Sequence, residues 1–256
     1  MMSFLILTSI AFTAALVPKV NLIHRTGKLL ATTTDYMNSK GELLKHCRGV
    51  KIGDPFPETA ADSIRKCVEE IESHSSHERL THSLQHFDGE WLMLYSTLPA
   101  FFKRIALRDL SAGTIPSEEP LILVNCVKQV VKLKPSGIYQ YDNLVEFHGS
   151  REHSTEAPIA GLHITRGTAE LNGAESADKT VRFNVAFYEN EATSASKAKA
   201  DADDMKKLFG FKPDDQLLGK YPAAFKSWSD IVYLDEDLRI MRGGKGNIYI
   251  LTKVAE

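Results

Sequence analysis

Between residues 121 and 188 the chain contains four strand-like runs that follow one another with no helical segment between them. The runs are rich in β-branched and aromatic residues and end at Pro, Gly, Asn or charged residues. They span residues 121–133, 137–147, 159–171 and 180–188. Consecutive strands without crossover helices predict antiparallel pairing. A meander of this length usually closes into a barrel or folds into a sandwich, because either arrangement removes its open edges.

An earlier strand, in the segment DGEWLMLYST at residues 88–97, is apolar on both faces. The Asp-Gly pair predicts a tight turn, and Trp91, Met93 and Tyr95 then alternate with Leu92 and Leu94. A strand in a one-sided sheet would carry polar residues on its solvent face, so this strand is expected to be covered on both sides. A closed barrel with helices packed outside it meets that requirement.

The C-terminal region predicts three further strands, at residues 229–234, 238–242 and 248–254, which gives about seven to nine in total. The intervening segment at residues 189–204 is rich in Ala, Ser and charge, and predicts a flexible loop that leads into a short helix at Met205–Phe209. We interpret this loop as a connector, with a lid over a cavity as the alternative.

Two helices are predicted before the strands, within residues 38–77. From Glu58 to about His74, Ile64, Cys67, Val68 and Ile71 recur at helical spacing and form one apolar stripe. We therefore expect a mainly β domain over residues 38–256, with helices at 38–77 that cover one side or end of a barrel at 86–254.

Residues 1–37 have the composition of a targeting presequence. The apolar run at residues 4–17 is shorter than the ~20 residues of a membrane-spanning helix, so residues 1–17 resemble a signal peptide. Residues 18–37 resemble a transit peptide, since they carry Lys, Arg and Thr and no acidic residue precedes Asp35. Together they resemble the bipartite presequence of proteins sent to the secondary plastids of algae. A plain secretory signal is the alternative.

Several kinds of function are disfavoured by the sequence. The formal charge is −2, which disfavours a nucleic-acid partner. The three cysteines form no Cys-x-x-Cys pair, and the histidines at residues 74–86 lie in a hydrophilic connector, so no metal site is expected. No Gly-x-Ser-x-Gly nucleophile motif occurs, and the three acids at 235–237 predict a hydrated turn. We expect no catalytic residue and no cofactor.

Three segments resemble motifs of the plastid lipid-associated protein family, also called fibrillins or plastoglobulins. Residues 233–251, YLDEDLRIMRGGKGNIYIL, are similar to the closing signature of that family. Residues 89–97, GEWLMLYST, resemble its opening strand, and residues 142–147, DNLVEF, resemble a middle segment. The three segments occur in the family's order over roughly residues 40–254.

The resemblance implies a lipocalin-like antiparallel β-barrel with a hydrophobic interior. In such barrels a Gly-x-Trp on the first strand places an indole across the closed end, under an Arg from a late strand. Trp91 is the expected plug. Strand alternation places Arg239 and Arg242 on opposite faces, and we favour Arg242 as the inward partner, with Arg239 as the alternative.

The resemblance also implies a protein that binds or organises carotenoids, quinones or fatty acyl lipids at plastoglobules or thylakoids, as a peripheral partner of the membrane surface. The expected ligand-binding wall of the barrel comprises Trp91, Met93, Tyr95, Val145, Phe183, Val185, Phe187 and Arg242, with Val124 or Cys126. A dry, packed interior is the alternative for each of these residues.

Two other functions remain open at the level of sequence. An isomerase or cyclase on the same barrel would place Tyr139, Glu146 or His148 in the cavity as acid or base. A surface coat would use an exposed apolar mouth or helix stripe to sit on lipid, with no internal ligand.

Overall fold

A computed structural model describes residues 37–54, 58–115, 121–149, 159–172, 180–195, 199–209, 211–212 and 219–255. The predicted presequence, apart from its last residue, lies outside these ranges. The predicted boundary between presequence and domain therefore stays a prediction.

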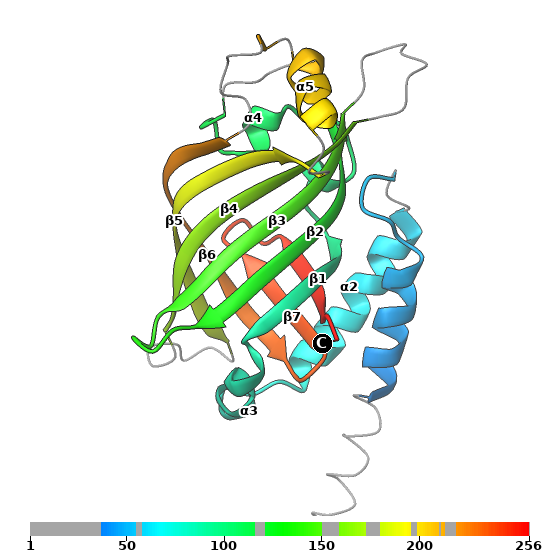
Figure 1. The fold of residues 1–256 in the computed structure, drawn as a ribbon. Helices are drawn as coiled ribbons and strands as arrows, with labels where there is room; N and C mark the ends of the chain where they lie inside the picture. The colour runs from blue at the N-terminus through cyan, green and yellow to red at the C-terminus, as the bar shows by residue number, and fades with distance from the viewer. Residues whose placement is uncertain are drawn as a thin grey trace, which may run out of the picture.

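The described chain forms a closed antiparallel barrel in which each strand pairs with the next and β8 pairs with β1 (Figure 1). This confirms the predicted fold class. The strands are β1 (Gly89–Ser96), β2 (Ile122–Leu133), β3 (Tyr139–Gly149), β4 (Ile159–Asn172), β5 (Val181–Ser194), β6 (Gly219–Leu234), β7 (Leu238–Gly243) and β8 (Ile248–Lys253).

Two apolar cores explain why β1 is apolar on both faces. One core fills the barrel and includes Trp91 and Met93. The other lies between the outer wall of the barrel and the N-terminal helices, and includes Tyr95 from β1 and Ile240 from β7. β1 and β7 lie between the two cores, so the side chains on both faces of these strands are buried away from water.

The N-terminal helices cover one side of the barrel rather than an end. The first helix spans residues 37–48 and is followed by α2 (Glu58–Ser73); Figure 1 shows both lying alongside the barrel wall. The apolar stripe of α2 is buried through Ile64, Val68 and Ile71, as its spacing predicts. Leu43 and Cys47 complete this outer core from the first helix.

Short helices lie at the two ends of the barrel (Figure 1). At one end lie α3 (His77–Ser83) and η1 (Leu84–His86), and α3 contributes the buried Leu80 to the inner core. At the other end lie η2 (Pro99–Phe101), α4 (Leu107–Leu110) and α5 (Lys199–Leu208). Phe101, Leu107 and Met205 are buried there against the inner core.

Two strands extend beyond their predicted limits. The prediction of a flexible loop from residue 189 is wrong up to residue 194, because β5 continues to Ser194 after a register shift between Phe187 and Glu189. Its small residues turn inward there: Ala192 is fully buried. β6 begins at Gly219, ten residues before its predicted start, although Pro222 cannot donate to the ladder.

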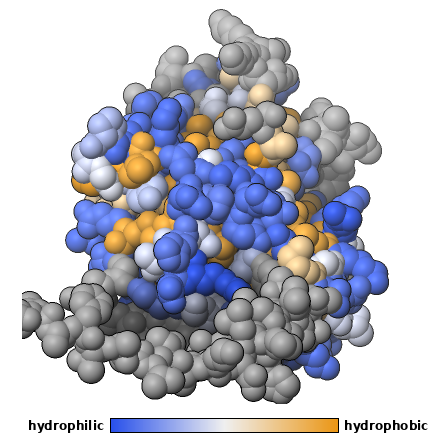
Figure 2. Space-filling model, turned by 90° about the horizontal axis from the view of Figure 1, so that it is seen from below, coloured by the Kyte–Doolittle hydropathy of each residue, from blue (hydrophilic) through white to orange (hydrophobic). Residues whose placement is uncertain are grey.

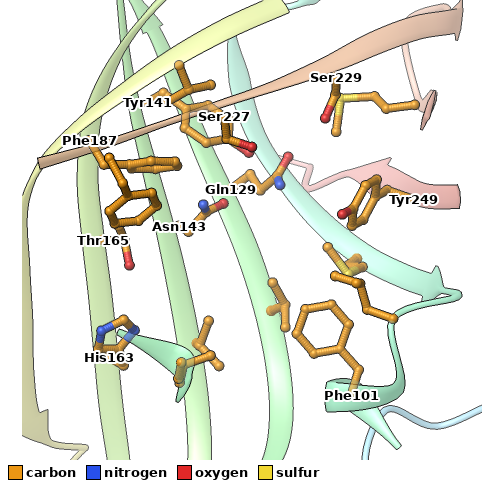
Figure 3. A pocket seen from close by; sticks show the side chains of 18 of the residues that line it. Phe101, Gln129, Tyr141, Asn143, His163, Thr165, Phe187, Ser227, Ser229 and Tyr249 are labelled. Atoms are coloured by element: carbon orange, nitrogen blue, oxygen red, sulfur yellow. The ribbon is translucent and has the colours of Figure 1, made fainter. Parts of the chain in front are cut away.

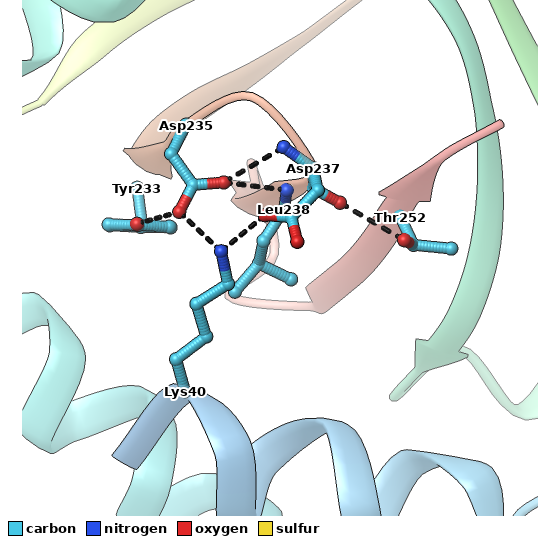
Figure 4. A network of polar contacts seen from close by, with 6 residues as sticks. All are labelled: Lys40, Tyr233, Asp235, Asp237, Leu238 and Thr252. Carbon is cyan, nitrogen blue, oxygen red and sulfur yellow. Dashed lines mark hydrogen bonds and ion pairs between the residues drawn. The ribbon is translucent and has the colours of Figure 1, made fainter. Parts of the chain in front are cut away.

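The acidic turn between β6 and β7 anchors the first helix to the barrel (Figure 4). Asp235 accepts hydrogen bonds from the backbone of Asp237 and Leu238 and from Lys40 Nζ at 2.7 Å. Lys40 also pairs with Asp237. Burial alone raises the pKa of Asp235, but these hydrogen bonds hold it below its ordinary value. The turn was expected to be hydrated, but it is partly buried and holds the first helix against the barrel through these contacts.

None of the helices in the described ranges combines the length and the apolar character needed to cross a membrane.

Candidate functional site

Trp91 closes one end of the barrel. Its side chain is fully buried, and its Nε1 donates a hydrogen bond to the carbonyl of Phe87 at 3.0 Å. The ring of Phe87 packs edge-on against Phe183, with centroids 5.0 Å apart, and Phe183 meets Tyr141 at 4.9 Å. These aromatic rings fill the closed end, so Trp91 and Phe183 act there as packed core residues.

Arg239, and not Arg242, lies over the Trp91 ring. The guanidinium carbon of Arg239 is 4.7 Å from the Trp91 ring centroid and 5.1 Å from that of Phe87. Arg239 is fully buried and donates to Oε1 of Gln129. Burial lowers the pKa of Arg239 to about 10, so the side chain stays charged at neutral pH. The expectation of an arginine over the plug holds, but its assignment to Arg242 is wrong.

Arg242 points outward because it is three residues further along the alternating strand. Its Nε and Nη2 atoms contact the two carboxylate oxygens of Glu72 at 2.7 and 2.9 Å. Glu72 lies on α2, so this bidentate pair fastens the helix to the outer wall. Arg242 therefore has no place in the interior.

Gly89 is required chiefly by its backbone conformation, and the side chain of Lys253 occupies the space beside it. A Cβ at residue 89 would lie 2.6 Å from Cε of Lys253, and the φ angle of Gly89 is +132°. Lys253 donates to the carbonyl of His86 at 3.0 Å, and its Nζ lies 5.4 Å from the Trp91 centroid. The Gly of the Gly-x-Trp motif thus leaves room for a second cation beside the indole.

Tyr95 lies outside the barrel, contrary to the expectation from simple alternation. The register of β1 against β8 shifts between Met93 and Tyr95, which is the signature of a bulge. The shift turns Tyr95 to the outer core, where its ring meets Phe102 at 6.5 Å. A bulge between Val124 and Cys126 has a similar effect on β2: Val124 is fully buried in the inner core, and Cys126 is half-buried opposite Glu146.

A cavity of about 230 Å³ lies inside the barrel, beyond the packed aromatic end (Figure 3). Four of the predicted wall residues line it: Met93, Val145, Val185 and Phe187. Segment 98–110, which covers the far end, adds Leu98, Phe101 and Leu110. A larger hollow of about 540 Å³ lies on the outer surface of β4–β6, where it includes outward side chains such as Glu170 and Lys226. The internal cavity is the candidate site because its walls are mostly apolar.

Sequence reasoning missed the polar part of the cavity lining. Besides the hydroxyl groups of Tyr141 and Tyr249, six polar side chains line it: Gln129, Asn143, His163, Thr165, Ser227 and Ser229. Gln129, Asn143 and Thr165 lie an even number of residues from inward-facing apolar residues on the same strands. This spacing is the sequence signal that could have predicted their inward orientation. Alternation alone does not predict polar residues at these positions, because it assigns the inward face to apolar side chains.

His163 is the most unusual of these residues. Its side chain is fully buried, and neither ring nitrogen has a hydrogen-bond partner among the described residues. Burial lowers its pKa to about 4, so the imidazole is neutral at pH 7. The side chain of Asn190 lies close enough to raise this pKa, but its influence is smaller than that of burial, and the two side chains are not in hydrogen-bonding geometry.

The residues named for an enzymatic function do not line this cavity. Glu146 is exposed and His148 is only partly buried. Tyr139 packs edge-on against Phe87, with ring centroids 5.3 Å apart. Within the described ranges, no three His, Cys, Asp or Glu side chains gather in a way that could hold a metal ion.

Comparison with known proteins gives one family. The PAP_fibrillin family model matches residues 37–252, which comprise the first helix and all eight strands of the described barrel except the last residue of β8. A search of curated proteins finds no match. The members of this family are structural, lipid-associated proteins that are not known as enzymes. Because the match covers most of the chain, the protein belongs to the fibrillin family of plastid lipid-associated proteins.

Proposed function

We propose that this fibrillin is a non-enzymatic protein that binds one lipophilic molecule inside its barrel at plastid lipid surfaces, plastoglobules or thylakoids. The observation that carries the proposal is the cavity of about 230 Å³ within a barrel whose opposite end is filled by Trp91 and its neighbours. Removal of apolar ligand surface from water stabilises a complex by roughly 25 cal/mol per Å².

The size of the cavity narrows the ligand class. Its volume lies slightly below the roughly 300–1,000 Å³ of typical ligand sites. A slender acyl or prenyl chain, or the end of a longer molecule, fits this space better than a complete carotenoid. Among the expected ligands, fatty acyl lipids and quinone tails are therefore favoured.

We infer an entry path for the ligand beside the part of β6 that has no second strand partner among the described residues. β7 pairs with β6 only from Ser229 onward, so in the described part of the chain residues 219–228 have no strand on that side. Ser227 and Trp228 line both the internal cavity and the outer hollow. A chain could pass the half-exposed Trp228 without breaking a ladder hydrogen bond.

The chemistry of the lining supports a binder over an enzyme. Among the described residues that line the cavity, none is Asp, Glu, Lys or Cys. Burial raises the pKa of Tyr141 and of Tyr249, so both hydroxyls stay protonated. Acid–base catalysis normally requires a second group poised to exchange a proton near neutral pH, and this lining provides none.

Extraction of the native protein from its own cells, followed by mass spectrometry of co-purified molecules, tests the proposal. We expect one lipophilic molecule per chain. If the protein retained no internal molecule even after incubation with an excess of lipid, the proposal would be contradicted. A fusion of residues 1–37 to a fluorescent reporter tests the proposed bipartite plastid presequence, since arrival in the secretory pathway alone would favour the plain signal.

A second candidate, attachment to lipid surfaces, is favoured by the tip of the β2–β3 hairpin. Leu133 and Ile138 are 48% and 37% exposed there, beside the exposed Lys132 and Lys134. Exposed apolar side chains flanked by lysines suit an anionic membrane surface. Figure 2 views the molecule from this end and shows separate orange areas among blue ones. Such a surface suits shallow contact better than a continuous coat.

Flotation with liposomes that contain anionic lipid tests this attachment. Replacement of both Leu133 and Ile138 by Ser should reduce the floated fraction severalfold. Tyr188→Ser is the matched control, because Tyr188 is 50% exposed on the outer wall. Equal loss in both variants would exclude the hairpin tip as the contact.

A further inference from the structure

Four polar residues form a row around the inside of the barrel, which we call the polar belt. Gln129 on β2 is paired with Asn143 on β3, Asn143 with Thr165 on β4, and Thr165 with Asn190 on β5. Directly paired residues in antiparallel strands share a face of the sheet. The belt therefore crosses four neighbouring strands at one level, and Figure 3 shows its first three members around the cavity.

Both ends of the belt are satisfied by the protein. Gln129 accepts from Arg239 at the closed end. Asn190 accepts from Thr165 Oγ1 at 2.8 Å and donates to the carbonyl of Ser111 at 3.0 Å, which fixes the segment after α4. These contacts explain why Gln129 and Asn190 are polar without any reference to a ligand.

Two groups that line the cavity have unpartnered polar atoms, Asn143 within the belt and His163 beside it. Oδ1 of Asn143 has no hydrogen-bond partner among the described residues, although Tyr141 reaches the same amide group. His163 lies two residues from Thr165 on the same face of β4, and both its ring nitrogens are unpartnered in the described part of the chain. Buried polar groups are almost always hydrogen-bonded, so these atoms require a partner that is not part of the described protein.

The charge state of His163 limits the chemistry of that partner. A neutral imidazole offers one N–H donor and one acceptor nitrogen. None of the described residues that line the cavity is Lys or Arg. Arg239 lies at the closed end, where its Nη2 donates to Gln129 while its Nε and Nη1 have no hydrogen-bond partner in the described part of the chain. A carboxylate in the cavity would therefore lose its hydration without gaining an ion pair.

We propose that the cavity selects a lipophilic molecule that carries one uncharged oxygen group, a hydroxyl or a ketone, which hydrogen bonds to His163, with Asn143 as a second contact for a hydroxyl. A hydrocarbon of the same shape would leave His163 unpartnered, and a carboxylate would be desolvated without compensation. The inference rests on the proposed function and specifies the headgroup that the site takes.

Displacement of a fluorescent apolar probe by decanol, 2-decanone, decanoate and decane at pH 7.5 tests the inference. We expect the alcohol and the ketone to bind about tenfold tighter than decane and decanoate, which is the value of one net hydrogen bond. His163→Leu should reduce the affinity for decanol to that for decane, with decane unchanged. His163→Gln, which keeps a donor and an acceptor, should retain part of the preference.

The outcomes separate this inference from the proposed function. Equal affinity for the four probes would overturn the inference and leave an internal lipid site intact. Failure of every probe to bind would overturn both. The stability of the variants provides an independent readout, because loss of an unpartnered buried group should not destabilise the empty protein. A clearly less stable His163→Leu protein would show that His163 is satisfied in the fold, which contradicts the inference.

Discussion

The two halves of the barrel interior differ in how completely side chains fill them. At the closed end, the rings of Phe87, Trp91 and Phe183 pack together, and Arg239 lies over two of these rings and donates to Gln129, although its Nε and Nη1 have no hydrogen-bond partner among the described residues. The other half keeps a cavity of about 230 Å³, where His163 and Oδ1 of Asn143 are buried without partners in the described ranges. The first region is organised as a protein core and the second as a binding site.

This difference separates stability from function. Large rings close one end and fix the shape of the barrel, whereas the middle keeps open space and unpaired polar atoms at a cost in stability. Substitutions at the closed end should therefore reduce stability, and substitutions in the cavity should change binding and pH response.

Trp91→Ala should lower the free energy of unfolding by about 3–5 kcal/mol, because it opens a cavity under Arg239 and removes the ring that faces its charge. Urea unfolding at pH 7.5 measures the change. Trp228→Ala is the matched control, since Trp228 is 37% exposed, and it should cost about 1 kcal/mol or less. Similar losses in the two variants would mean that Trp91 is not the plug.

Acidification should destabilise the wild-type protein through His163. The folded-state pKa of about 4 lies below the ordinary value of 6.5, so the stabilisation is complete above pH 6.5 and is lost as the pH falls towards 4. The loss amounts to about 3 kcal/mol. Urea unfolding at pH 7 and pH 4 should show a smaller difference, by about this amount, in His163→Leu than in the wild type.

Other acid-sensitive groups are present in both proteins, so the comparison isolates His163. The hydrogen bonds that hold the pKa of Asp235 low, for example, respond to acid equally in the wild type and the variant. If the two proteins lost the same stability between pH 7 and pH 4, His163 would not be buried in its neutral form.

Arg242→Ala should have the smallest effect, a loss of about 1 kcal/mol or less, because its ion pair with Glu72 is partly exposed and screened by solvent. Thermal unfolding at low and high salt measures it, and the difference from wild type should shrink at high salt. If Arg242→Ala lost as much stability as Trp91→Ala, the placement of Arg242 on the outer wall would be wrong.

The sequence predicted the fold better than it predicted the details of the interior. Trp91, Met93 and the stripe of α2 follow simple periodicities, so their burial could be predicted from spacing alone. Tyr95 was misplaced because a bulge reverses alternation after Met93, and a bulge depends on the partner strand. Arg239 and Arg242 could not be separated by pattern, since both faces of β7 are apolar.

The functional lining was the least predictable part. His163 and Asn143 lie on inward faces, where sequence reasoning expects apolar residues, and strand pairing is needed to show that the polar belt is continuous. The start of β6 was missed because Pro222 and the adjacent alanines lack a strand signal, although the long β5 provides a partner for them. Local rules fail where tertiary pairing or a ligand site decides the residue.

Binding of a fluorescent lipophilic probe to two adjacent tryptophan variants of β3 tests the central claim most directly. Val145 faces the cavity, and the next residue, Glu146, is exposed on the outer wall. Val145→Trp should fill the cavity and lower probe affinity at least tenfold, whereas Glu146→Trp should bind like the wild type. Equal binding by two folded variants would contradict an internal lipid site.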